Sequence, residues 1–296
     1  MSDYTKYQHV EKLGSDEVEG ILCGEVYVFP KLDGTNAHAW FDGEQMRYGS
    51  RKRELSLDSD NAGFMAAMQD NEGLTALCTA HPGRHVWGEW LVPHSLKTYR
   101  EDAWRKFYVF DVTTEDGSYV EYERLAHLCT FYSVDYIQAL RVIENPTEEN
   151  ATQCLQENTF LIDDGKGIGE GVVLKNYQFR NKFGRVCWAK IVTNEFKEKH
   201  KKQDGAPKTK GSKQVEAEIV GYYVTKALVD KEFAKIQSED GWNSRMIPRL
   251  LNTVFHCLVT EHTWDACKKY KMPTVDFRAL SNHCNARVKA LKPELF

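Results

Sequence analysis

Residues 25–41 read EVYVFPKLDGTNAHAWF. Two runs rich in β-branched and aromatic residues, 25–29 and 37–41, flank a polar segment that contains Asp33-Gly34. Runs of this kind that are bounded by turn dipeptides predict β-strands. Taken alone, the Asp-Gly pair would also suit a hairpin turn. The stretch therefore predicts two strands joined through the hexapeptide KLDGTN, residues 31–36.

Short runs of β-branched and aromatic residues, separated by turn signals, continue to about residue 194. Helical spacing near 61–77 and 121–140 interrupts it, and further strands are predicted at 107–110, 171–174 and 186–192. This pattern predicts an α+β domain over residues 1–196, with mixed or antiparallel sheets and flanking helices.

Beyond this domain the composition changes. Residues 197–213 hold seven Lys against Glu198 and Asp204, a local charge of +5, with no apolar residue able to anchor them. They predict an exposed basic linker, which is either a merely solvated loop or a contact for a phosphate backbone. Residues 214–296 instead predict a small all-α domain, because they show three amphipathic helical patterns, within 215–236, 248–258 and 277–291.

Bulk composition narrows the class of protein. The 296 residues are 42% hydrophobic and 28% charged, an ordinary globular balance. No apolar run approaches the ~18 residues that span a bilayer. Residues 1–10 lack the apolar stretch of a signal peptide, so we expect a cytoplasmic or otherwise intracellular protein. The net charge of −4 does not exclude nucleic acid as a partner, because basic groups can gather on one face.

The hexapeptide at 31–36 also has a chemical interpretation. Transfer of AMP from ATP requires an amine that is unprotonated and aimed at the α-phosphate, and lysine can supply it. Gly34 would let the backbone come close to a nucleotide, and Asn36 could donate a neutral hydrogen bond. Lys31 is therefore the candidate nucleophile.

Five further segments follow the hexapeptide in order. They are 50–51, 87–90, 107–111, 170–175 and 188–192. In this order and at these intervals, the six segments resemble motifs I, Ia, III, IIIa, IV and V of the covalent nucleotidyltransferases. That superfamily contains ATP-dependent DNA ligases, RNA ligases and mRNA capping enzymes. Six ordered matches are far more specific than any single one.

Within the superfamily, the chain resembles the RNA ligase 2 family known from bacteriophages. DNA ligases and capping enzymes follow motif V with an oligonucleotide-binding β-barrel, which should show alternating strands and frequent turns. Here a basic linker and helical patterns follow instead, as in the RNA ligase 2 family. Residues 196–199, FKEK, also resemble that family.

The resemblance implies roles for the nucleotide-binding residues. Lys31 would form a lysyl–AMP phosphoramidate. Arg51 would lie near the ribose and phosphate of the adenylate. Arg53 is the alternative, since it would share a strand face with Arg51. Glu89 would accept a hydrogen bond from the ribose hydroxyl; as an ordinary structural residue it would instead pair with His85 or a lysine.

The aromatic and acidic motifs imply two more contacts. Phe110 would stack on adenine, with Phe107 as the alternative and a core position as the structural explanation for either ring. Glu170 would hold a divalent metal ion, Mg²⁺ or Mn²⁺, because a carboxylate oxygen beside phosphates is what Mg²⁺ prefers.

Motif V departs from the family pattern. The family shows two lysines separated by one residue near the α-phosphate. Here Lys190 is present but Val192 occupies the second position, and alternation would place both on one strand face. The site would therefore have one fewer cation, unless Lys175, Lys197 or Lys199 compensates. As an ordinary structural residue, Lys190 would be a lysine at a strand end.

The implied reaction has three nucleotidyl transfers. Lys31 takes AMP from ATP, the AMP passes to a 5′-phosphate end, and a 3′-hydroxyl then attacks and releases AMP. We expect a monomeric RNA ligase that acts on nicked duplexes or broken RNA ends, in RNA repair. The alternatives are an ATP-dependent DNA ligase, an mRNA guanylyltransferase, and a nucleic-acid-binding relative that has lost catalysis, which Val192 would favour.

Overall fold

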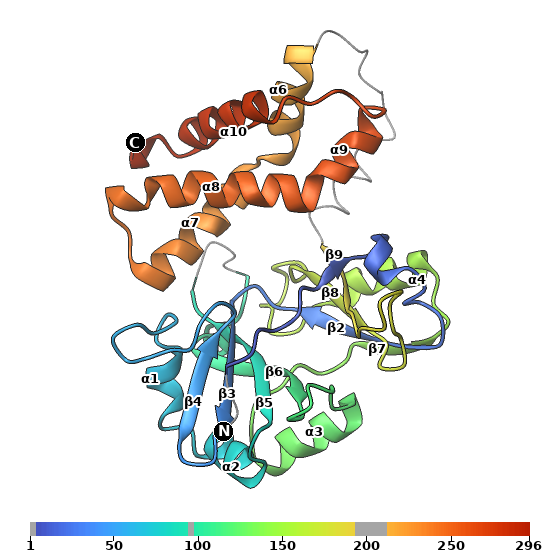
Figure 1. Ribbon diagram of the computed structural model, residues 1–296, viewed down its shortest axis with the longest axis vertical. Coiled ribbons are helices and arrows are strands. Elements are labelled where there is room, and N and C mark those ends of the chain that lie inside the picture. Colours follow the sequence, from blue (N-terminus) through green and yellow to red (C-terminus); the bar gives the residue numbers. More distant parts are fainter. Residues whose placement is uncertain (1–3, 94–97, 193–211) are drawn as a thin grey trace. The chain divides into compact units, whose positions relative to one another are not determined.

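The structure, a computed structural model, describes residues 4–93, 98–192 and 212–296. The chain divides into two compact units, Met1–Lys202 and Gln203–Phe296, drawn from blue to yellow and from orange to red in Figure 1. Most of the predicted linker, 197–213, lies outside the described residues. Its last two positions belong to the first helix of the second unit. The domain boundary at residue 196 stays a prediction.

Two β-sheets build the described part of the first unit. Sheet A has the strand order β1 (Glu11–Lys12), β9 (Ala189–Val192), β8 (Gly171–Lys175), β2 (Glu25–Lys31) and β7 (Arg141–Glu144). Its neighbours are antiparallel except for β1 and β9. Sheet B is antiparallel throughout, with the order β4 (Met46–Ser50), β3 (Thr35–Phe41), β5 (His85–Leu91) and β6 (Lys106–Thr113).

Four α-helices accompany these sheets in the described residues. They are α1 (Phe64–Met68), α2 (Glu72–Ala80), α3 (Tyr122–Phe131) and α4 (Glu148–Gln153). The predicted helical region 61–77 is broken in two, because Asn71 starts a new helix by accepting a hydrogen bond from the Leu74 amide at 2.8 Å. The predicted region 121–140 is helical only over α3. The predicted α+β class is confirmed.

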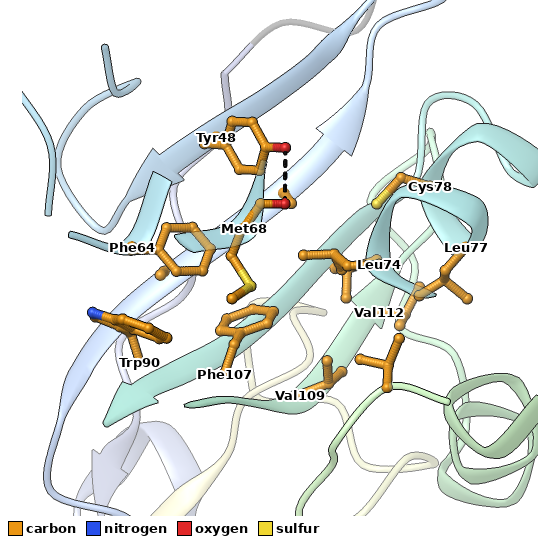
Figure 2. Packing of buried hydrophobic residues seen from close by; sticks show 14 of the residues in the cluster. Tyr48, Phe64, Met68, Leu74, Leu77, Cys78, Trp90, Phe107, Val109 and Val112 are labelled. Carbon is orange, nitrogen blue, oxygen red and sulfur yellow. Dashed lines mark hydrogen bonds between the residues drawn. The ribbon is translucent and has the colours of Figure 1, made fainter. Parts of the chain in front are cut away.

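Alternation along each strand separates two faces. In β2, Val26 and Val28 pack into one hydrophobic cluster while Tyr27 and Phe29 pack into another. Sheet B also has two different faces. On one of them, Ala37, Ala39 and Val86 pack against α1, α2 and α3 and form the largest core cluster. Figure 2 shows this core, with Phe64, Trp90 and Phe107 in contact and the Tyr48 hydroxyl donating to the Met68 carbonyl oxygen at 3.3 Å.

The second unit is helical in its described residues, and the prediction of three helices was wrong in number. Five α-helices are present: α6 (Ser212–Tyr223), α7 (Lys226–Asp240), α8 (Ile247–Cys257), α9 (Thr263–Lys269) and α10 (Phe277–Leu291). The pattern at 215–236 is two helices because the Thr225 side chain caps α7, accepting from the Leu228 amide at 3.2 Å. A π-helical turn separates α8 from α9. One cluster with Val254 and Leu280 fully buried holds the unit together.

None of the helices in the described ranges is long and apolar enough to cross a membrane.

Candidate active site

The hexapeptide at 31–36 joins the two sheets. Lys31 is the last residue of β2 in sheet A, and Thr35 is the first residue of β3 in sheet B. The two strands do not pair with each other, so the segment is not a hairpin turn. The candidate nucleophile therefore stands where the chain leaves one sheet for the other.

Lys31 contacts the candidate metal ligand directly. Its Nζ lies 2.6 Å from Oε2 of Glu170, because Lys31 is in register with Gly171 on the neighbouring strand β8. The Lys31 side chain is 26% exposed and that of Glu170 is 9% exposed. Residues far apart in sequence thus form one partly buried ion pair, and its lysine keeps access to solvent.

The turn after Lys31 is fixed by hydrogen bonds. The Gly34 amide donates to Glu89 Oε1 and the Asp33 amide donates to the Tyr99 hydroxyl, both at 2.9 Å. A Cβ atom on Gly34 would lie 2.5 Å from the Trp90 carbonyl oxygen, so only glycine fits here. The sequence suggested that Gly34 lets the backbone approach a nucleotide. In the structure, Gly34 instead lets the backbone approach strand β5 of the protein itself.

Glu89 and Asn36 lie side by side. They are register partners on β5 and β3, and Tyr108 on β6 is the next partner of Glu89, so these three side chains share one face of sheet B. Tyr108 packs in the same cluster as Phe29 and Val173 of sheet A. The Glu89 face of sheet B and the Lys31 face of sheet A therefore meet across shared apolar contacts.

The two candidate stacking rings differ in environment. Phe107 is 4% exposed and packs on Phe64 with ring centroids 4.9 Å apart, inside the core of Figure 2. Phe110 is half-buried and sits at a β-bulge, because Trp87 pairs with Asp111 while Gly88 pairs with Val109. Phe107 is therefore a core residue. Phe110 remains the candidate for adenine stacking.

Arg51 and Arg53 do not share a strand face, so that expectation was wrong. Strand β4 ends at Ser50, and the chain then turns back so that Gly49 bridges Glu54. The guanidinium of Arg51 lies 2.9 Å from His9 Nδ1. That of Arg53 donates to backbone carbonyl oxygens of the following loop. In the part of the chain that the structure describes, neither arginine forms a hydrogen bond or an ion pair with Lys31 or Glu170.

Lys190 and Val192 do lie on one strand face, as alternation predicts. Lys190 is in register with Val173, and Val192 with Gly171, the partner of Lys31 on the other side of β8. Lys190 therefore projects from the same face of sheet A as Lys31. The other two lysines that could compensate, at 197 and 199, lie outside the described residues.

Lys175 is not available to compensate, because it belongs to a buried ion pair. Its Nζ lies 2.8 Å from Asp111 Oδ1 and donates to the Phe110 carbonyl oxygen at 2.6 Å, and the two side chains are 3% and 0% exposed. Burial raises the pKa of Asp111 and lowers that of Lys175, while each partner opposes the shift of the other. Tyr7 and Trp188 also donate to Asp111. This network supports the Phe110 bulge.

Sequence reasoning missed the structural roles of Asp111 and Tyr99. Asp111 closes the quoted run 107–111, and a carboxylate at the end of an apolar strand was a signal for a buried partner. Tyr99 carried no signal, because nothing in the sequence around it indicates contact with Asp33.

Two buried histidines lie further along the Glu89 face of sheet B. His38 stacks on Trp87 with ring centroids 4.0 Å apart, and His85 lies 5.3 Å from His38. Burial lowers the pKa of His38 well below its usual range, with a further contribution from His85. Burial also lowers the pKa of His85 to about 4. Both rings are therefore neutral in the folded chain at pH 7.

This burial predicts acid sensitivity. In the unfolded chain these histidines become protonated below about pH 6.5. In the folded chain His85 becomes protonated only near pH 4. Stability is therefore present above pH 6.5 and is lost as the pH falls through this window, by roughly 3 kcal/mol for His85. Urea unfolding at a series of pH values should show a shallower profile for His85→Gln. The exposed His127→Gln variant should keep the profile of the unmodified chain.

Comparison with known proteins places this chain in a family. The family model described as RNA ligase matches residues 24–192, more than half of the chain. The chain therefore belongs to the RNA ligase family, which confirms the expected relationship. The match spans the segment from β2 to β9 and includes each proposed site residue.

Solved structures of an RNA ligase from Naegleria gruberi have a similar fold. A glutamate-to-alanine variant with ATP and Mn has a TM-score of 0.51 and 21% identity over 67% of this chain. A lysine-to-methionine variant with AMP and Mn has a TM-score of 0.52 and 20% identity, also over 67% of this chain. The alignments cover 58% and 59% of those proteins. A comparison with curated proteins found no match.

Proposed function

We propose that this chain is an ATP-dependent RNA ligase that joins 3′-hydroxyl and 5′-phosphate ends through a lysyl–AMP intermediate, in RNA repair. The observation that carries the proposal is the Lys31–Glu170 ion pair at the junction of the two sheets, in a chain of the RNA ligase family. The ATP, AMP and Mn in the Naegleria gruberi structures support the choice of nucleotide and of a divalent cation.

In the first transfer, the Lys31 ammonium would lose a proton to solvent, and its neutral Nζ would then attack the α-phosphorus of ATP. An N–P bond forms, the bond to the bridging oxygen breaks, and pyrophosphate leaves. Glu89, on the face of sheet B that packs against the Lys31 face of sheet A, would accept a hydrogen bond from the ribose. Phe110 would stack on adenine, and Asn36 would donate to the nucleotide. Most of the rate enhancement would come from this positioning and from neutralising phosphate charge.

The cations of the site have separate proposed roles. Lys190 projects from the same face as Lys31 and would neutralise the α-phosphate. Arg51, which directly follows the last residue of β4, would bind the ribose and phosphate. Because Val192 has no charge, Lys190 would be the only residue of β9 to neutralise the α-phosphate. Val192 is also the one sequence feature that favours a catalytically weakened relative.

Glu170 has the chemistry of a magnesium or manganese ligand. Its carboxylate lies at the site and already holds a cationic group, the Lys31 ammonium. Mg²⁺ is commonly bound by one or two carboxylates together with phosphates and water. When bound, the metal ion would supply charge neutralisation at the phosphates. A Glu170 carboxylate that held this ion would pair less strongly with Lys31, which would leave the lysine side chain free to turn towards the α-phosphate.

Loss of the carboxylate charge should therefore cripple adenylation. We expect Glu170→Gln to lower the rate of protein–AMP formation by about 10²-fold or more, because the site loses its anionic ligand while the side chain keeps its size. Transfer of label from radioactive ATP to the protein measures this. Glu157→Gln, a carboxylate in the exposed ion pair with Arg141, is the matched control. An unchanged rate in Glu170→Gln would remove Glu170 from the metal site.

The experiment that tests the function uses matched substrates. The unmodified chain should acquire label from ATP and not from GTP, which separates it from guanylyltransferases. It should then seal a nicked duplex with an RNA 3′-hydroxyl strand faster than one with a DNA 3′-hydroxyl strand. Equal or faster sealing of DNA would favour the DNA ligase alternative. Failure to form any adduct would favour a relative that has lost catalysis.

A further inference from the structure

Asn158 is a buried asparagine beside the proposed metal ligand. It directly follows the short helical turn η3 (Cys154–Glu157), which continues α4, and it is 1% exposed. Leu155 of η3 packs in the same hydrophobic cluster as Val172 and Leu174 of β8. This packing brings Asn158 to the start of β8, at the point where Glu170 precedes the strand.

Asn158 forms hydrogen bonds with the residues on both sides of Glu170. Its backbone carbonyl oxygen accepts from the Gly169 amide at 2.8 Å. Its side-chain Nδ2 donates to the Gly171 carbonyl oxygen at 2.6 Å. Because Glu170 lies between these two anchored residues, its backbone has little freedom to shift or turn. The carboxylate is therefore presented to Lys31 from a fixed point on the chain, with Oε2 2.6 Å from Nζ.

The Asn158 amide also packs closely against Gly169. A Cβ atom on Gly169 would lie 2.5 Å from Asn158 Nδ2, and the next two nearest atoms would be Cγ and Oδ1 of the same side chain. The absence of a side chain at residue 169 therefore gives the Asn158 amide the room that it occupies. This contact adds to the two hydrogen bonds that hold the backbone beside Glu170.

The side-chain oxygen of Asn158 makes no hydrogen bond in the parts of the chain that the structure describes. A buried amide with an unsatisfied oxygen is unfavourable for stability. Within the same described residues, the hydrogen bond of the side chain is the one from Nδ2 to Gly171. An apolar side chain would serve the core without this cost, so the bond to Gly171 indicates a role beside Glu170.

The loop that begins at Asn158 also supports the turn after the candidate nucleophile. Ile162 in this loop forms a β-bridge with Tyr99. The Tyr99 hydroxyl accepts from the Asp33 amide at 2.9 Å. One segment thus supports the backbone beside both members of the ion pair in the site.

We propose that Asn158 is a positioning residue of the candidate active site: it holds the backbone on both sides of Glu170 and so keeps the carboxylate where it would bind the divalent metal ion. Contacts that orient a metal ligand without touching the metal ion raise the affinity of the site. The role of Glu170 as a metal ligand rests on the proposed function, whereas the hold on its backbone rests on the contacts of Asn158.

Metal dependence tests this role. Asn158→Ala should raise the Mn²⁺ concentration that gives half-maximal protein–AMP formation about tenfold, while the rate at saturating Mn²⁺ should recover to within about threefold of that of the unmodified chain. A second measurement uses an ATP analogue with a methylene group between the α- and β-phosphorus atoms, which cannot transfer AMP. Binding of Mn²⁺ to the full chain with this analogue, measured by water-proton relaxation, should weaken by a similar factor.

Gly169→Ala changes the same contact from the other side. Its Cβ atom would displace the Asn158 amide, so this variant should also raise the half-saturating Mn²⁺ concentration. In the Asn158→Ala background the same substitution should add little, because the side-chain atoms that it meets have been removed. Gly169→Ala also decides the question if Asn158→Ala does not fold.

Asn181→Ala is the matched control. Asn181 is likewise buried in the first unit, at 6% exposed. Its amide nitrogen donates to Glu17 at 2.6 Å, and its amide oxygen accepts from two backbone amides of its own turn at 3.0 Å. Its loss should lower the free energy of unfolding in urea but leave the half-saturating Mn²⁺ concentration unchanged, because its partners do not belong to the segment around Glu170.

Several outcomes would overturn the positioning role. They are an unchanged Mn²⁺ dependence in both Asn158→Ala and Gly169→Ala, an equal rise in Asn181→Ala, and fully additive effects of the first two substitutions. If Glu170→Gln lost adenylation while Asn158→Ala kept the Mn²⁺ dependence of the unmodified chain, this inference would fail and the proposed function would stand.

The two readouts also separate the reverse case. If the unmodified chain formed no adduct while Mn²⁺ binding with the analogue still weakened in Asn158→Ala, the proposed function would fail and the positioning role would stand. A chain that neither formed the adduct nor bound Mn²⁺ would reject both.

Discussion

Lys31→Arg should form no protein–AMP adduct, a loss of roughly 10³-fold or more, as expected when a covalent nucleophile is removed. The arginine keeps the positive charge and can still pair with Glu170, but it stays protonated and does not attack phosphorus. The variant therefore separates the nucleophilic role of Lys31 from its charge. Labelling with radioactive ATP, followed by denaturing electrophoresis, measures the adduct.

A second arm locates the defect in the reaction. Lys31→Ala should still seal RNA supplied with an already adenylated 5′ end, because the final attack by the 3′-hydroxyl does not use the lysine as a nucleophile. Lys182→Arg serves as a control for the substitution itself. A stable adduct in Lys31→Arg would place the nucleophile elsewhere and reject the central assignment.

Asp111→Leu should lower the free energy of unfolding of the first unit by about 3–5 kcal/mol. The substitution leaves Lys175 buried without its counter-ion, and within the described residues its Nζ keeps only the Phe110 carbonyl oxygen as a hydrogen-bond acceptor. Tyr7 and Trp188 lose their acceptor as well. Urea unfolding monitored by tryptophan fluorescence measures the loss.

The exposed ion pair between Arg141 and Glu157 provides the comparison, because its atoms lie 2.6 Å apart but remain in solvent. Arg141→Gln should leave the free energy of unfolding nearly unchanged. An equal loss in the free energy of unfolding for Asp111→Leu and Arg141→Gln would show that burial does not set the contribution of the Asp111–Lys175 pair. The same Asp111→Leu protein should bind ATP more weakly, since Asp111 supports the backbone at the Phe110 bulge.

Local patterns predicted the strands that carry the site. The runs at 25–29, 37–41, 107–110 and 171–174 all lie in strands, because their composition suits half-buried sheet positions. The sequence did not predict strand β5, because Gly88 and Glu89 interrupt its apolar run. The structure explains that glycine: a Cβ atom there would lie 2.5 Å from the Phe107 ring.

Other features depend on contacts between distant segments and could not be read locally. Whether Lys175 faces solvent or Asp111 is decided by the packing of sheet A on sheet B. The placement of Arg53 depended on β4 ending at Ser50, and no residue in that stretch is a strong strand terminator. The ordered motifs predicted that Lys31 and Glu170 act in the same reaction, but they did not predict that the two side chains form an ion pair.

The hexapeptide at 31–36 has a mechanical consequence. It is fastened to sheet A through Lys31 and Glu170 and to sheet B through Gly34 and Glu89. If the two sheets moved apart, the bend would fall on Lys31, the proposed nucleophile, and would separate it from Glu170. We therefore expect substrates to enter without a change in the angle between the two sheets. Lys31, the proposed nucleophile, therefore lies at a junction that hydrogen bonds to both sheets hold in place.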